Sequence, residues 1–92
     1  MKPVVFDDEA RAEFAAAAAY YEAQRAGLGA DFVAEVERAA QRIGQTPQAF
    51  PPYAHGARKC VLRRFPYTVY FLELGDRVWI AAVAHQRRRP SY

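Results

Sequence analysis

Half-way along the sequence, the spacing of the apolar residues changes from a helical period to a strand period. Before the change, two stretches place apolar side chains three and four residues apart, as amphipathic helices do. After the change, three short runs are rich in β-branched and aromatic residues, which is typical of strands. Residues 46–56 separate the two parts and hold three prolines and a glycine, which indicates a loop. The chain is therefore expected to pack helices against a sheet.

The first helix is expected over residues 9–25. This stretch is rich in alanine, the residue with the highest helix propensity, and it contains neither glycine nor proline. Asp7 or Asp8 stands just before it, at the position of an N-cap. Gly27 suits the left-handed conformation that closes a helix, and Gly29 is expected to interrupt the helical path as well. The helix should therefore end at a short glycine link.

A second helix is expected over residues 31–43. Its apolar side chains recur three and four residues apart: Phe32, Val36, Ala39, Ala40 and Ile43. Gly44 and Pro47 follow this stripe and are typical of a helix end. Two helices joined by so short a link form an antiparallel hairpin, and the hairpin must bury its apolar stripe.

Three strands are expected after the loop. They lie at residues 59–63, 68–74 and 77–85. Gly75 and Asp76 separate the last two strands and form a two-residue hairpin signal. A short apolar run at residues 3–6 adds a strand before the helices. We therefore predict an α/β (α+β) fold in one domain over residues 1–92. It has an N-terminal strand, an antiparallel two-helix hairpin and a three-stranded antiparallel meander packed against the helices.

Length and composition exclude several classes of protein. A chain of 92 residues is too short for two independent cores. No apolar run approaches the roughly 20 residues of a membrane span, and the acidic start is unlike a signal peptide. The single cysteine, Cys60, excludes an internal disulfide and a cysteine-based zinc site, and its alternation with Leu62 predicts a small core residue. We expect a cytoplasmic protein with no metal site, no cofactor and no membrane partner.

Charge is distributed unevenly between the two halves of the chain. Residues 1–46 carry eight acidic and five basic side chains, which gives a net charge of −3. Residues 47–92 carry eight basic and two acidic side chains, a net charge of +6, and seven of the eight cations are arginine. Arginine binds phosphate and carboxylate in bidentate geometry, so this half suits nucleic acid or an acidic protein. A solvated basic surface without a partner explains the same charge equally well.

Three motifs, in this order and spacing, resemble those of one known family. The first is Gly27-Leu28-Gly29 in the helical hairpin, followed by Phe32. The second is Arg64-Phe65-Pro66-Tyr67, which leads into a strand with Val69-Tyr70. The third and most specific is the ending Val83-Ala84-His85-Gln86-Arg87-Arg88-Arg89-Pro90-Ser91-Tyr92. Together they are similar to the RelE/ParE toxin superfamily, and the ending resembles the Val-Ala-His-x-x-Arg-x-Pro-x-Tyr pattern of its ParE-like branch. The resemblance covers nearly the whole chain.

The resemblance implies the toxin of a bacterial type II toxin–antitoxin system, of the kind linked to plasmid stabilisation, neutralised by a cognate antitoxin. ParE-like members inhibit DNA gyrase, whereas RelE-like members cleave mRNA on the ribosome, and only the second group are enzymes. The fold does not choose between them. RelE-like toxins commonly have an arginine at the position of Thr68. Because that arginine is absent and the ending is ParE-like, we expect gyrase inhibition, with the mRNA endoribonuclease as the alternative.

A further alternative is a non-toxic member that binds its antitoxin and acts only in autoregulation. In each case the expected partner is an acidic, partly disordered antitoxin segment that folds on the toxin. Operator DNA would then be reached only through the antitoxin.

Candidate site residues differ between the two activities. For a nuclease, His85 is the candidate general base because its ordinary pKa lies near neutrality. The other catalytic candidates are Arg63, Arg88 and Tyr92. A structural alternative is that His85 donates a hydrogen bond that pins the C-terminal tail. For gyrase inhibition, the candidate target-binding residues are Arg64, Tyr67, Arg87, Arg88 and Arg89. Of the three consecutive arginines, Arg88 matches the family pattern.

Overall fold

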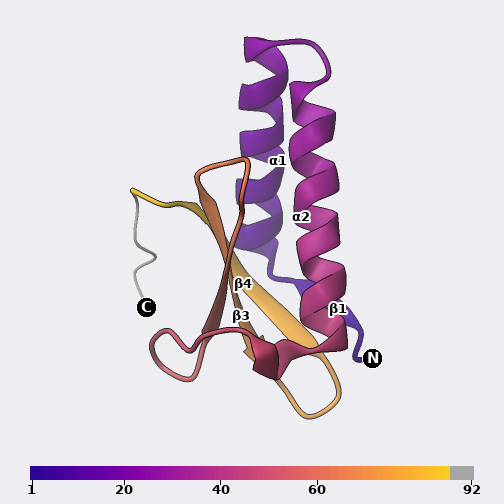
Figure 1. Ribbon diagram of the computed structural model, residues 1–92, viewed down its shortest axis with the longest axis vertical. Helices are drawn as coiled ribbons and strands as arrows, with labels where there is room; N and C mark the ends of the chain where they lie inside the picture. The colour runs from indigo at the N-terminus through magenta and orange to yellow at the C-terminus, as the bar shows by residue number, and fades with distance from the viewer. Residues whose placement is uncertain (88–92) are drawn as a thin grey trace.

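The computed structural model describes residues 1–87 and arranges them as two helices on one face of a sheet (Figure 1). The elements in chain order are β1 (Val4–Phe6), α1 (Asp8–Gln24), α2 (Leu28–Gln45), the short 3-10 helix η1 (Pro47–Ala49), β2 (Arg58–Val61), β3 (Tyr67–Glu73) and β4 (Val78–His85). The predicted α+β fold is confirmed. Neither helix in residues 1–87 has the length and apolar character needed to cross a membrane.

Helix α1 begins where the sequence places an N-cap. The side chain of Asp7 accepts a hydrogen bond from the backbone N–H of Glu9 at 2.9 Å, so Asp7 rather than Asp8 is the cap. Ala10 and Ala17 on one face are buried, and Phe14 and Tyr21 pack against the core from the same face. Because these residues follow the helical period, the alanine-rich stretch buries one side and leaves the other in solvent.

The link between α1 and α2 is shorter than expected, because α2 begins at Leu28. Gly27 has a φ of +90°, the left-handed conformation that its position predicted. Gly29 lies inside α2, so the prediction that it interrupts the helix is wrong. A Cβ at Gly29 would lie 2.6 Å from the carbonyl oxygen of Ala18 and 2.9 Å from the Cβ of Glu22. Glycine is required here because the two helices approach each other closely.

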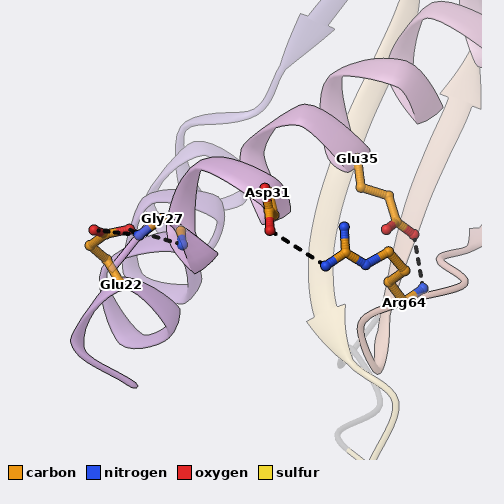
Figure 2. A network of polar contacts seen from close by, with 6 residues as sticks. Glu22, Gly27, Asp31, Glu35 and Arg64 are labelled. Carbon is orange, nitrogen blue, oxygen red and sulfur yellow. Dashed lines mark hydrogen bonds and ion pairs between the residues drawn. The ribbon is translucent and has the colours of Figure 1, made fainter. Parts of the chain in front are cut away.

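Glu22 holds the same link from the end of α1, and sequence reasoning did not identify it. Its carboxylate accepts hydrogen bonds from the backbone N–H of Gly27 at 3.0 Å and of Gly29 at 3.0 Å (Figure 2). The first N–H groups of a helix have no partner within the helix, and a negative charge there also meets the positive end of the helix dipole. Glu22 therefore caps α2 from the neighbouring helix.

The sheet has the strand order β1-β4-β3-β2. Strands β2, β3 and β4 form the predicted antiparallel meander, with Cys60 opposite Val69 and Val69 opposite Val83. Strand β1 pairs in parallel with β4, where Val4 lies opposite Val78. The sequence predicted a strand at β1 but did not predict that it pairs with β4. The meander alone presents β4 as a free edge, and β1 covers that edge before the chain enters α1.

The core lies between the hairpin and the helix-facing side of the sheet (Figure 1). Phe32 of α2 is fully buried and stands at its centre. Its ring centroid lies 5.3 Å from that of Tyr21 on α1, 5.2 Å from that of Phe65 and 5.2 Å from that of Tyr67. These offset and edge arrangements are favourable for aromatic rings. One residue of α2 thus joins both helices to the end of the sheet where β3 begins.

Candidate functional site

Five of the predicted site residues gather at one end of the sheet, where β2 turns into β3 and β4 ends (Figure 1). We call this group the basic rim: Arg63, Arg64, Tyr67, His85 and Arg87. The three arginines are exposed, whereas Tyr67 and His85 are half-buried. The remaining predicted site residues, Arg88, Arg89 and Tyr92, lie outside the described residues.

Contacts between β3 and β4 join the two parts of the basic rim. The register places Tyr67 opposite His85, and their ring centroids lie 5.3 Å apart in an edge arrangement. One residue further along, the backbone N–H of Gln86 donates a hydrogen bond to the carbonyl of Pro66 at 2.8 Å. The turn that carries Arg63 and Arg64 is therefore fixed beside the end of β4.

His85 makes a hydrogen bond in the opposite sense to the one expected. Its Nδ1 accepts from the backbone N–H of Arg87 at 3.1 Å, where the structural alternative had the histidine as donor. A ring nitrogen that accepts carries no proton, which assigns the proton of the neutral imidazole to Nε2. The bond closes a turn at Gln86 and Arg87, directly after β4.

Helix α2 holds the turn between β2 and β3 through two acidic residues that sequence reasoning missed. Oε2 of Glu35 accepts hydrogen bonds from the backbone N–H of Arg63 at 2.8 Å and of Arg64 at 3.2 Å. One helical turn earlier, Asp31 forms an ion pair with the guanidinium of Arg64 at 3.4 Å (Figure 2). The only sequence signal was the spacing of four residues, which places both carboxylates on one face of the helix.

The two arginines of this turn are in different environments. The guanidinium of Arg64 is paired with Asp31 and lies 5.4 Å from the ring centroid of Phe65, which is itself buried. Arg63 is exposed and forms no ion pair within residues 1–87. The turn thus offers one free cation and one that is partly neutralised.

The whole sequence can be compared with known proteins. Residues 4–90 match the family model for the ParE toxin of the type II toxin–antitoxin system, parDE. The chain belongs to the ParE toxin family. Its fold is similar to a solved structure of the chromosomal ParDE toxin–antitoxin system from P. aeruginosa, with a TM-score of 0.81 and 18% identity over 92% of this chain and 96% of that chain. No curated protein matches the sequence. The predicted superfamily is confirmed.

In this ParE-family toxin, the position where RelE-like toxins commonly have an arginine is part of the buried sheet. Thr68 is 4% exposed and pairs with Val61 on β2 and Ala84 on β4. Its neighbour Tyr67 points to the helix-facing side, so Thr68 faces the opposite side of the sheet. No cation is available at this position to stabilise a phosphate.

Cys60 and Tyr20 lie away from the basic rim. Cys60 is 3% exposed and accepts a hydrogen bond from the guanidinium of Arg42 at 3.6 Å. Burial raises the pKa of its thiol, which disfavours the reactive thiolate and confirms the predicted core role. Tyr20 is exposed, because α1 contacts the rest of the protein on one face only and its neighbour Tyr21 occupies that face.

Proposed function

We propose that this ParE-family chain inhibits DNA gyrase through the basic rim and that a cognate antitoxin neutralises it. The observation that carries the proposal is the gathering of Arg63, Arg64 and Arg87 at one end of the sheet. Family membership supports the toxin, and the ParE-like ending supports gyrase as the target. Exposed arginines attract anions, so the rim suits DNA held by gyrase or an acidic surface of the enzyme.

Two observations, at His85 and at Thr68, favour inhibition by binding over RNA cleavage. A ribonuclease needs a base to activate the 2′-hydroxyl and cations around the phosphate. The Nδ1 of His85, the candidate base, is occupied by the backbone N–H of Arg87. Thr68 is buried where a phosphate-binding arginine would stand. We therefore propose that the chain acts without catalysis of its own.

The antitoxin that fits this chain is an acidic segment. The half of the sequence that forms β2, β3, β4 and the basic rim carries eight basic and two acidic residues. A partly disordered acidic segment can order itself along such a surface, and charge attraction speeds the encounter. We propose that contact with operator DNA is made through the antitoxin and not by the toxin.

The test is supercoiling of relaxed plasmid by purified bacterial gyrase, with and without the chain, after circular dichroism has shown that the chain is folded. Inhibited supercoiling or trapped cleaved DNA, reversed by the antitoxin, is the expected result. Folded protein without effect contradicts the proposal, and cleavage of mRNA on programmed ribosomes would then identify a nuclease. Harmless expression of folded protein without antitoxin would instead indicate a non-toxic, autoregulatory member.

A further inference from the structure

We propose that Glu35 is a positioning residue for the turn that carries Arg63 and Arg64. Its carboxylate fixes where the turn presents its cation, and its charge moderates the attraction of the rim for anions. The inference rests on the proposed function, because it takes the basic rim as the surface that contacts the target. It assigns a role to a residue of α2 that lies outside the three motifs of the sequence.

Two successive backbone N–H groups of the turn donate to Glu35. The N–H groups of Arg63 and Arg64 have no backbone acceptor within residues 1–87, and both donate to Oε2 of Glu35 at 2.8 Å and 3.2 Å. Glu35 is 28 and 29 residues away from them in sequence. One charged oxygen that accepts from two successive N–H groups holds both of them in one orientation, so the position of this side chain constrains the path of the turn.

The second oxygen of the carboxylate takes no part in holding the turn. Oε1 of Glu35 is buried and has no hydrogen-bond partner within residues 1–87. An unpaired buried carboxylate oxygen costs stability. A neutral glutamine would supply the same acceptor to both backbone N–H groups at a smaller desolvation cost. The carboxylate adds a negative charge beside the turn that carries Arg63 and Arg64.

Phe65 anchors the turn independently of Glu35. Its side chain is 5% exposed, and its ring centroid lies 4.8 Å from that of Tyr21 and 5.2 Å from that of Phe32. The hydrophobic contact holds one end of the turn in the core, while Glu35 fixes the end that carries Arg63 and Arg64. Removing the carboxylate should therefore loosen the arginines without unfolding the protein.

Two substitutions at one position separate the two effects. Glu35→Ala removes the acceptor, so the turn loosens and inhibition of gyrase should weaken by about tenfold, because Arg63 and Arg64 are no longer held in one position. Glu35→Gln keeps an oxygen acceptor and removes the charge, so inhibition should equal or exceed that of the wild type. Glu37→Gln is the matched control, because Glu37 is exposed on the same helix and forms no ion pair within residues 1–87.

The experiment measures supercoiling over a range of toxin concentrations for the wild type, these three variants and Arg63→Ala. Each protein is first shown to be folded at the assay temperature by thermal unfolding. Amide hydrogen exchange at Arg63 and Arg64, followed by NMR, reports the turn directly. Among the three glutamate variants, we expect only Glu35→Ala to show faster amide exchange and weaker inhibition. Arg63→Ala should also inhibit gyrase more weakly, but its amide exchange should stay as slow as in the wild type.

The outcomes distinguish this inference from the proposed function. A folded wild-type chain that leaves supercoiling unchanged overturns both. If the wild type inhibits gyrase and Arg63→Ala inhibits it equally well, the proposal that the basic rim contacts the target is wrong. If Arg63→Ala weakens inhibition but a folded Glu35→Ala does not, only the role of Glu35 is wrong. If Glu35→Ala does not fold, Glu35→Gln still tests the proposal. A folded Glu35→Gln that keeps slow amide exchange but inhibits gyrase more weakly than the wild type overturns the proposed effect of the charge.

Discussion

At the scale of single residues, the basic rim is organised by side chains that accept hydrogen bonds from the backbone. Glu35 accepts from Arg63 and Arg64, and His85 accepts from Arg87. In both cases the acceptor sets the path of a segment, while the arginine side chains remain exposed. The chain thus separates the residues that shape the surface from those that meet a partner. Substitutions of the two groups should have different effects on folding and on binding.

His85 provides a direct test of structural against catalytic roles. Asparagine places a side-chain oxygen close to the position of Nδ1, so His85→Asn should keep the bond from the Arg87 N–H. His85→Ala loses it and should weaken gyrase inhibition by about threefold to tenfold. Supercoiling assays on both folded variants make the comparison. If the wild type instead cleaves RNA on ribosomes and both variants lose this activity, His85 acts as a base.

At the scale of elements, the helical hairpin depends on a close approach near its link. Gly29 lies under the carbonyl of Ala18, and the carboxylate of Glu22 closes the same junction. Backbone atoms cannot move aside as a flexible side chain can, so small size at this position is a packing requirement. The glycines of the hairpin motif therefore serve different purposes. Gly27 provides a left-handed conformation, and Gly29 provides space.

Gly29→Ala should destabilise the protein although alanine favours helix. The added methyl group would lie 2.6 Å from the Ala18 carbonyl oxygen, so α1 and α2 must separate. Overpacking of this kind costs about 1–3 kcal/mol, more than the gain in helix propensity. Chemical denaturation measures the change in the free energy of unfolding. Gly75→Ala is the control, because a Cβ there meets nothing within 4 Å, and equal stability of the two variants would refute the packing argument.

An ion pair connects the segment before β1 to the end of β3. Nζ of Lys2 lies 2.9 Å from Oε2 of Glu73 and donates to the carbonyl of Leu74 at 2.8 Å. The hydrogen bond from Lys2 lowers the pKa of Glu73. A carboxyl group with a lowered pKa in the folded state stabilises the fold above its unfolded pKa, and this contribution is lost as the pH falls through the folded value.

Lys2→Ala should therefore decrease the melting temperature slightly near neutral pH and have little effect in acid. Thermal unfolding of both proteins at neutral pH and at a pH below the titration of Glu73 provides the comparison. The change is expected to be small because the pair is partly exposed. A difference that grows as the pH falls would contradict the assigned ion pair.

At the scale of the whole molecule, the fold brings two oppositely charged halves of the sequence together. Residues 1–46 have eight acidic and five basic side chains and form β1 and the helices, whereas residues 47–92 have eight basic and two acidic. Asp31 and Glu35 are where the acidic half contacts the basic rim. The result is a molecule with a small net charge of +3 in which Arg63, Arg64 and Arg87 gather at one end of the sheet. Such a distribution favours oriented encounters with an anionic partner.

Association with the antitoxin should weaken as salt increases. Attraction between exposed charges is screened over a shorter distance at high ionic strength, so affinity should fall at least several-fold between roughly 0.05 M and 0.5 M salt. Titration calorimetry on the purified pair measures this. An affinity that does not change with salt would show that apolar contacts carry the complex and that the arginines do not take part.

Local sequence patterns predicted the elements and most of their order. Apolar spacing and the alanine-rich stretch predicted the helices, β-branched runs predicted the meander, and the N-cap of α1 was narrowed to Asp7 or Asp8, of which the structure shows Asp7. These features depend on residues close to one another in the chain, so local patterns are sufficient to find them. Neighbouring strands of a meander have a defined register, which places Tyr67 opposite His85 and brings the turn with Arg63 and Arg64 to the same end of the sheet.

The residues that hold the site and the hairpin together could be identified only from the folded chain. Glu35 contacts amides 28 and 29 residues away, β1 pairs with a strand near the other end of the chain, and Gly29 is needed because a second helix passes over it. A carboxylate on a helix has the same local pattern whether it faces solvent or a distant turn. Its role depends on which backbone amides the packed helix and sheet place beside it, and that is settled by long-range packing.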